Sequence, residues 1–287
     1  MIHSQSQLPI KLKRIQLFTS RRTVTLVLLM LVSLVPLFAA PQAELWPRWE
    51  AHNPNSTQVV DHSAWDRFLQ QYLVTNDPSG VHLFPYGQVS PADRAILNNY
   101  IRSLESTQVS GLNKDEQLAY WVNMYNAVTI QLILNNYPLN SIRNIRRPWD
   151  TALVRIEGEQ LTLNDIEHRI LRPIWKDPRI HYVVNCASIG CPNLQPRAYT
   201  STNWPELFDL AARQFINHPR GVNFSGSRPV FSSIFDWYQV DFGGNIQGVV
   251  THMLNYAEGP TAVALNQFAQ SNYGRVRYEY DWNLNRK

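Results

Sequence analysis

Both cysteines of the chain lie in one short segment, residues 181–194, together with a histidine. Its first residues, His181 to Val184, are β-branched and aromatic, which is typical of a buried strand. Ser188 and Pro192 then predict a loop. Reactive side chains often lie on a loop that a rigid strand positions. This segment is therefore the first candidate for a functional site.

The spacing of Cys186 and Cys191 leaves several interpretations open. A disulfide is one, because oxidising compartments favour this bond in exported domains. Alternatively, Cys186 is a nucleophile, activated by an imidazole and by a helix N-terminus or loop amides. Both thiols could also be buried and inert. A zinc site needs three or four ligands, and no second Cys/His pair follows nearby, so we expect no metal and no other cofactor.

A nucleophilic cysteine needs a base, and two histidines are candidates. His181 precedes Cys186 by five residues, so on a regular strand it would point to the opposite face unless a bulge intervenes. His168 is predicted on a helix beside Glu167 and is free to approach in space. These two neighbours project about 100° apart, so they do not pair with each other. A histidine on an amphipathic helix often only packs or caps, and that interpretation stays open for His168.

Three aspartates, Asp236, Asp241 and Asp281, lie among aromatic residues. An aspartate in such surroundings could orient an imidazole, as the third group of a catalytic triad does. Asp241 precedes Phe242 and two glycines, however, which is also typical of a residue that caps a turn.

The longest predicted helix spans residues 114–136. Asn113 is its expected cap, and the helix is apolar on nearly every face, which indicates a buried central helix. Asn123 and Asn126 lie three positions apart on it and share a face. Buried amides need hydrogen-bond partners. They either tie down the backbone of a packed loop or line a pocket and hold an oxyanion.

The remaining pattern predicts the fold class. Further helices are expected at 63–73, 91–104, 163–171, 203–216, about 245–257 and 260–269. Strands are expected in a hairpin at 151–163 that turns at Glu157 and Gly158, and at 181–184, 222–224, 229–232, 235–240 and 276–282. Helices come first, and mixed strands and helices follow without regular βαβ alternation. We therefore predict an α+β fold: a single domain with a central buried helix packed on a small mixed or antiparallel sheet.

The first 40 residues have the layout of a signal peptide or an N-terminal membrane anchor. Residues 1–22 carry five basic residues and no acid, and residues 23–40 are uncharged and rich in Leu and Val. A run of roughly 18 residues is near the lower limit for spanning a bilayer. Cleavage and retention both stay open. In either case we expect the rest to be exported, to the periplasm or the exterior, with residues 41–60 as an irregular linker and 61–287 as the domain.

Charge and composition restrict the partners. Of the 26 Lys and Arg, five lie in the leader, so the rest of the chain has 21 (26 − 5) against 22 Asp and Glu. Nucleic acid binding therefore loses its electrostatic argument. Nine Trp, 13 Tyr and 11 Phe supply material for an aromatic groove. We expect a peptide-like or other small substrate, or an envelope partner, and membrane contact only through the N-terminal segment.

Several motifs resemble DUF547, a bacterial and plant family of unknown function. The matching segments are 121–127, 166–172, His181 with Asn185–Ser188 and Cys191–Pro192, Ser233–Tyr238 with Asp241–Phe242, and 280–282. The resemblance implies an α+β domain distantly similar to papain-like or transglutaminase-like folds, with a Cys/His pair as the proposed site. It marks Asn126, Glu167, His168, His181 and Cys186 as motif positions.

The leading hypothesis is an exported, cysteine-dependent hydrolase or transferase that acts on a peptide or amide bond. Its nucleophile would be Cys186, its base His181 or His168, and its orienting group Glu167 or an aspartate, while Asn123, Asn126 or loop amides would hold the oxyanion. The alternative is a non-catalytic envelope binding module. It would have an aromatic groove and a structural disulfide between Cys186 and Cys191.

Overall fold

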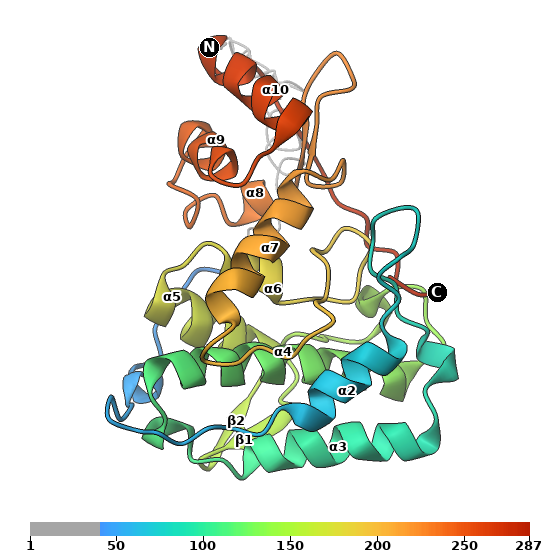
Figure 1. Cartoon of the computed structure of the whole chain (residues 1–287), viewed down its shortest axis with the longest axis vertical. Coiled ribbons are helices and arrows are strands. Elements are labelled where there is room, and N and C mark those ends of the chain that lie inside the picture. The colour runs from blue at the N-terminus through green and yellow to red at the C-terminus, as the bar shows by residue number, and fades with distance from the viewer. Residues whose placement is uncertain (1–40) are drawn as a thin grey trace, which may run out of the picture. The chain divides into compact units, whose positions relative to one another are not determined.

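A long helix, α4 (Lys114–Asn136), runs through the centre of residues 41–287, the part of the chain that the computed structural model describes (Figure 1). Asn113 caps the helix by accepting the Glu116 N–H at 3.0 Å, and acidic residues in the first turn favour the positive end of the helix dipole. Nearly every residue from 116 to 134 is buried. The predicted central helix is confirmed. The predicted leader, residues 1–40, lies outside the described residues.

Other helices cover α4. Helix α3 (Pro91–Glu105) packs along α4 and also contacts α2 (Ser63–Tyr72). A π-helix, η5 (Asp165–Leu171), packs on α4 as well and continues directly into α5 (Arg172–Trp175). Short 3₁₀ turns connect these elements: η1 (Pro47–Glu50), η2 (Tyr86–Gln88), η3 (Val109–Gly111) and η4 (Ile142–Asn144). The central helix is thus enclosed mainly by helices.

The strands form two small sheets. β1 (Val154–Ile156) and β2 (Glu159–Leu161) make the predicted hairpin, which turns at Glu157 and Gly158, both with positive φ. β3 (Val222–Asn223), β4 (Val230–Ser232) and β5 (Arg277–Glu279) form the second sheet, in which β4 pairs antiparallel with β3 and parallel with β5. The α+β class is confirmed. The prediction left a mixed or an antiparallel sheet open, and the structure has two sheets, an antiparallel hairpin and a mixed three-stranded sheet.

Two predicted strands are helical. Residues 181–184 lie largely in a short helix, α6 (Ile180–Val183), and residues 235–240 form the end of α8 (Ile234–Trp237) and a turn. Short apolar runs do not distinguish a buried strand from a buried helical turn, because both bury all their side chains. All four residues of α6 are buried. The argument from strand alternation about the direction of His181 was therefore wrong.

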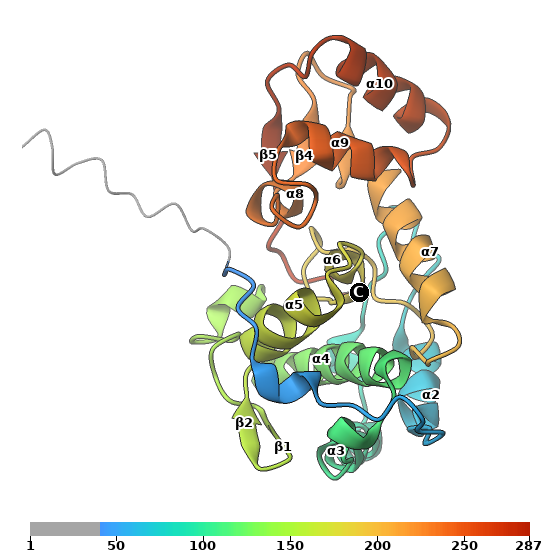
Figure 2. The same cartoon turned by 90° about the vertical axis from the view of Figure 1, so that its left-hand side faces the viewer.

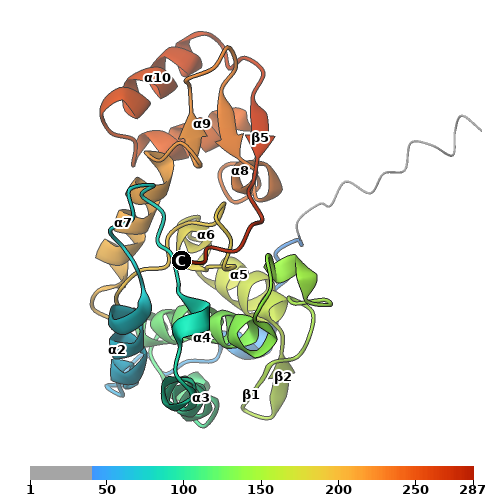
Figure 3. The same ribbon diagram turned by 90° about the vertical axis from the view of Figure 1, so that its right-hand side faces the viewer.

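The C-terminal half contributes α7 (Trp204–Ile216), α9 (Ile246–Leu254) and α10 (Gly259–Gln270). Helices α8, α9 and α10 gather around the second sheet, and α7 runs from this group toward α2 (Figure 2). After β5 the chain returns past α6 (Figure 3). There Leu284 forms a β-bridge with Ser188, and Arg286 forms one with Phe84. This return brings the last residues of the chain to the cysteine loop.

The segment 41–60 is irregular apart from η1, but it packs on the domain. The Glu44 N–H donates to the His168 carbonyl at 2.9 Å, and the Trp46 N–H donates to the Arg169 carbonyl at 3.0 Å. Trp49 is 2% exposed. The prediction of a linker misses this packing, because proline and asparagine signals do not show where nearby tryptophans bury their rings. No helix within residues 41–287 combines the length and the apolar character needed to cross a bilayer.

Candidate functional site

One buried amide anchors the loop that carries both cysteines. Asn126 on α4 donates its Nδ2–H to the Val183 carbonyl at 2.8 Å, and its Oδ1 accepts the Asn185 N–H at 2.8 Å. The Asn185 side chain extends this link, because it accepts the Ala187 N–H at 2.8 Å and donates to the Pro192 carbonyl at 2.7 Å. The central helix therefore sets the position of both the end of α6 and the loop.

Asn123 does the same for another loop. Its Nδ2–H donates to the Tyr199 carbonyl at 2.7 Å, and its Oδ1 accepts the Tyr199 N–H at 3.0 Å. Asn123 and Asn126 are at most 1% exposed. Of the two interpretations open for these amides, the geometry favours loop anchoring over the binding of an oxyanion.

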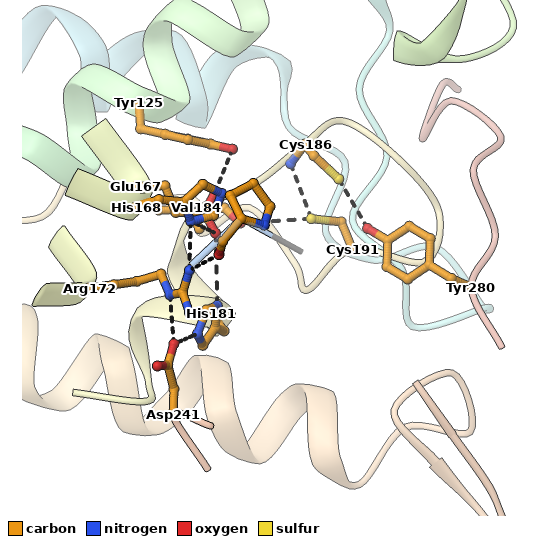
Figure 4. A network of polar contacts seen from close by, with 11 residues as sticks. Tyr125, Glu167, His168, Arg172, His181, Val184, Cys186, Cys191, Asp241 and Tyr280 are labelled. Carbon is orange, nitrogen blue, oxygen red and sulfur yellow. Dashed lines mark hydrogen bonds and ion pairs between the residues drawn. The ribbon is translucent and has the colours of Figure 1, made fainter. Parts of the chain in front are cut away.

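Cys186 is only partly buried as a residue, and its thiol lies between two hydroxyl groups. Its Sγ is 3.1 Å from Ser188 Oγ and 3.0 Å from Tyr280 Oη, and the two oxygens are 2.9 Å apart. Figure 4 shows the Tyr280 hydroxyl pointing at this sulfur. Tyr280 reaches it because the chain returns past the loop after β5.

Cys191 is buried beside Cys186. Its Sγ accepts the backbone N–H of Cys186 at 3.1 Å and lies 3.8 Å from the Val184 carbonyl oxygen (Figure 4). Both cysteines are free thiols. No disulfide joins them in this structure, and the disulfide that the sequence left open stays a prediction.

The surroundings of the two thiols move their pKa values in opposite directions. The Cys191 thiol and the hydroxyls of Ser188 and Tyr280 lower the pKa of Cys186 from 9.0 to about 7, and they outweigh the opposing effect of burial. Burial and the neighbouring Cys186 raise the pKa of Cys191 well above its ordinary value. Burial also raises the pKa of Tyr280, so its hydroxyl stays protonated and can donate. Cys186 is thus the reactive thiol of the pair.

The two candidate histidines lie in a separate polar network (Figure 4). His181 donates its Nε2–H to Asp241 Oδ2 at 2.6 Å, and its ring stacks on Tyr238 with centroids 4.1 Å apart. Its other ring nitrogen, Nδ1, is buried without a hydrogen-bond partner and lies 3.8 Å from Glu167 Oε1. One of the three candidate aspartates, Asp241, therefore does orient an imidazole.

Arg172 joins His168 to this network. Its Nε–H donates to Asp241 Oδ2 at 2.6 Å, and Nη1 donates to His168 Nδ1 at 3.0 Å and to the Pro41 carbonyl at 2.7 Å. Because His168 Nδ1 accepts from a guanidinium, this ring is neutral, and burial lowers the pKa of His168. Glu167 accepts the Tyr125 hydroxyl at 3.0 Å. The network joins η5, α5, α6 and the turn after α8.

Within residues 41–287 neither histidine makes a hydrogen bond to Cys186, so this conformation does not assemble a Cys/His pair. The contacts of Ser188, Tyr280 and Arg172 were not predicted from the sequence. Ser188 and Arg172 lie inside the motifs of the resemblance, and Tyr280 begins its last one. These motifs were the only signal in the sequence that these residues belong to the site, since tyrosine and serine are too common to stand out by residue type.

Arg220 holds the far end of the cysteine loop. Its guanidinium donates to the Ile189 carbonyl at 3.1 Å and to Asn193 Oδ1. The same Asn193 oxygen accepts the His82 N–H at 2.9 Å. The loop is therefore attached at its start to α4 and at its end to the turn that follows α7.

Aromatic rings adjoin the thiol site. Tyr280 packs against Trp237 and Trp282, with centroids 4.9 and 4.6 Å away, and Trp149 meets Trp282 edge-on at 5.8 Å. All four residues are only partly buried. The ring of Tyr280 thus belongs to this aromatic cluster, while its hydroxyl belongs to the thiol site.

A separate pocket of about 500 Å³ lies beside the histidine network, with Arg172, Lys176 and Asp241 in its wall. The N-terminal segment closes one side through Ala43 and Leu45. Among the described residues no three His, Cys, Asp or Glu side chains converge in a way that could hold a metal ion.

The comparisons with known proteins agree with the motif resemblance. Residues 109–216 match the model of the family described as "Protein of unknown function, DUF547". This region contains α4, η5, α6 and the cysteine loop. Neither the comparison with curated proteins nor that with solved structures gave a match. The similarity to papain-like or transglutaminase-like folds therefore stays a prediction.

Proposed function

We propose that the protein is a cysteine-dependent hydrolase or transferase that acts on amide or peptide bonds. The proposal rests on the chemistry of the site, because the family that residues 109–216 match is described as one of unknown function. One observation carries the proposal. The thiol of Cys186, a partly buried residue, is surrounded by the Cys191, Ser188 and Tyr280 groups, which lower its pKa to about 7. A thiol of this pKa is half ionised at neutral pH, and the thiolate is the nucleophilic form.

The proposed reaction follows from these contacts. The Cys186 thiolate attacks the carbonyl carbon of the substrate; a C–S bond forms, the C–N bond breaks, and the amine leaves with a proton. The hydroxyl pair of Ser188 and Tyr280, at 3.1 and 3.0 Å from the sulfur, relays this proton and regains one from solvent. Water or an amine then attacks the thioester carbon, and the C–S bond breaks to release Cys186. Transfer of the acyl group to water makes the protein a hydrolase, and transfer to an amine makes it a transferase.

The histidines have a positioning role in this proposal. Because the three neighbours of Cys186 already favour its thiolate, the attack does not depend on an imidazole base. The pair of His181 and Asp241, linked at 2.6 Å, joins α6 to the turn after α8. Since α6 ends just before the cysteine loop, this pair helps to hold the nucleophile in place.

The proposal includes export. Its support is the layout of residues 1–40, a basic start followed by an uncharged apolar run. The near-neutral remainder suits a peptide-like or other small substrate rather than nucleic acid. We propose that the protein meets the membrane only through its N-terminal segment.

The test measures the reactivity of Cys186 in the reduced, full-length protein. Iodoacetamide labelling followed by peptide mapping should modify Cys186 with a midpoint near pH 7, and Cys186→Ser should abolish the fast phase. Cys191→Ser is the matched control for the second thiol. An activated ester, p-nitrophenyl acetate, should leave one acetyl group on Cys186. A midpoint at the pH of an ordinary thiol, near 8.5, with no acetyl adduct would refute the enzyme.

A binding module is the second candidate, and the aromatic cluster favours it. Partly exposed rings around Tyr280 offer stacking surface for a peptide or a glycan. Both thiols are free in this structure, and the structural disulfide of this candidate stays part of the proposal. If Cys186→Ser leaves the biological activity of the protein intact, the binding module replaces the enzyme.

A further inference from the structure

The proposed reaction leaves one nucleophilic group beside the site without a chemical role. Cys191 is 4% exposed and too enclosed to attack a substrate itself. An inert residue there would only need to fill space. Instead, its sulfur lies against the backbone of Cys186, 3.1 Å from the amide nitrogen.

The loop geometry keeps the two thiols together. The Cys191 N–H donates to the Ser188 carbonyl at 3.1 Å, which closes a tight turn. Ala187, just after Cys186, has φ of 60°, and its N–H is held by the Asn185 side chain. The turn therefore folds Cys191 back onto Cys186. The two side chains are close enough for the Cys191 thiol to act on the Cys186 thiol as a hydrogen-bond partner.

We propose that Cys186 and Cys191 form a redox site in which a hydroperoxide oxidises Cys186 and Cys191 then closes a reversible disulfide. In the first step the Cys186 thiolate attacks the peroxide, the O–O bond breaks, and an alcohol or water leaves after taking up a proton; Cys186 becomes a sulfenic acid. In the second step the Cys191 sulfur attacks the Cys186 sulfur. An S–S bond forms, the S–O bond breaks, and the hydroxyl leaves as water with the Cys191 proton.

The order of these steps follows from the environment. Cys186 is the more exposed and the more acidic thiol, so it meets the oxidant first. Burial and the adjacent Cys186 raise the pKa of Cys191, so Cys191 stays protonated while Cys186 is a thiolate. Oxidation of Cys186 to a neutral sulfenic acid removes the nearby negative charge. The Cys191 thiol then attacks the Cys186 sulfur and gives its proton to the leaving hydroxyl, which protects Cys186 from further, irreversible oxidation.

The formation of the disulfide does not depend on the proposed enzymatic activity. Its regulatory effect does rest on the proposed function, because a disulfide at Cys186 inactivates the nucleophile of the enzyme. Disulfide formation and enzymatic activity can be tested separately, because each has its own experiment. The peroxide experiment below needs no substrate. The acetyl transfer to Cys186 described above is measured on reduced protein, where no disulfide is present.

The experiment treats reduced, full-length protein with hydrogen peroxide in the presence of dimedone, which traps sulfenic acids, and reads the intact mass. The wild type should lose two hydrogen atoms, carry almost no dimedone and recover its mass with dithiothreitol. Cys191→Ser should instead carry dimedone on Cys186. Cys186→Ser should be oxidised much more slowly than either.

Three outcomes would overturn the redox site. One is wild-type protein that carries dimedone to the same extent as Cys191→Ser, since Cys191 would then not resolve the sulfenic acid. A second is protein that peroxide leaves unchanged in mass. The third is a disulfide between two molecules, which non-reducing electrophoresis at several protein concentrations reveals. A site that closes its disulfide but transfers no acetyl group would refute only the enzyme.

Discussion

The phenolic oxygen of Tyr280 lies 3.0 Å from the sulfur of Cys186, although the two residues are 94 positions apart. The link depends on the return of the chain after β5, where Leu284 pairs with Ser188. The last residues of the chain therefore complete the thiol site. They also lie outside the region 109–216 that matches the family model.

Removal of the Tyr280 hydroxyl should make Cys186 a more ordinary thiol. Tyr280→Phe deletes one of the donors that hold the pKa of Cys186 at about 7, so that pKa should rise and iodoacetamide labelling at pH 7 should slow severalfold. The ring itself, which packs on Trp237 and Trp282, is kept. Tyr278→Phe, two residues earlier in β5, is the control. Equal labelling rates in Tyr280→Phe and the wild type would show that the hydroxyl does not stabilise the thiolate.

Arg220 should stabilise the cysteine loop. Arg220→Ala removes the bonds to the Ile189 carbonyl and to Asn193, and charged hydrogen bonds of this kind are worth about 1.5–3 kcal/mol. We expect urea unfolding to show a loss of this size and Cys191 to become open to alkylation in the native state. Arg213→Ala removes an arginine whose side chain is 45% exposed, and it should change stability little. A protected Cys191 in Arg220→Ala would argue against this anchoring.

Substitution of Asn126 tests whether the central helix α4 anchors the cysteine loop. Asn126→Ala leaves the Val183 carbonyl and the Asn185 N–H without their partner in a buried place, which should lower the free energy of unfolding by roughly 2–4 kcal/mol. Asn136→Ala, at the exposed end of the same helix, should cost far less. Similar losses for the two variants in chemical denaturation would contradict the anchoring role.

Asp241 should give the protein an acid-sensitive part of its stability. Burial opposes its ionisation, but hydrogen bonds from His181 and Arg172 lower the pKa of Asp241 to about 2. Because this folded-state pKa lies below the unfolded value of about 3.9, the contribution is present above pH 4 and is lost as pH falls toward 2, up to about 2 kcal/mol. The free energy of unfolding measured against pH should show this slope, and Asp241→Asn should remove it. Asp236→Asn, an exposed carboxylate nearby, should retain the slope.

His62 should make the free energy of unfolding depend on pH between 6.5 and about 4, a higher range than that of Asp241. It is 4% exposed, its Nδ1 contacts the Tyr100 hydroxyl at 2.7 Å, and burial lowers its pKa to about 4. A histidine with a lowered folded-state pKa contributes fully above the unfolded value of about 6.5, and this contribution is lost as pH falls through 4. His62→Gln should flatten the stability curve between pH 6.5 and 4. His52→Gln, at an exposed position, should leave the curve unchanged.

Long helices and the hairpin were predictable because their signals are local. Asn113 and Ser90 cap α4 and α3 by accepting backbone N–H groups at 3.0 and 3.1 Å, as their place before each apolar run suggested. The hairpin turn at Glu157 and Gly158 was identified from the two residues themselves. The helices α6 and α8 were not, since each has only four residues and shows no period that separates helix from strand.

The site was predictable in part. Cys186, His181, His168 and Glu167 stood out by residue type and spacing. Glu167 and His168 lie on η5, which packs on α4, His181 lies on α6, and Cys186 lies on the loop that follows α6. Their grouping was not predictable. His181 bonds to Asp241, 60 positions away, while Cys186 bonds to Tyr280, so residues that are neighbours in sequence belong to different networks.

The sequence by itself determined the α+β class, the buried central helix and the presence of two thiols on one loop, because hydrophobic periodicity, caps and turn residues act over a few positions. Only the tertiary structure decided which groups surround Cys186. Its pKa depends on hydroxyls and thiols within about one hydrogen-bond length, and one of these comes from the far end of the chain. Distances of that kind are set by how distant segments pack, which local patterns do not encode.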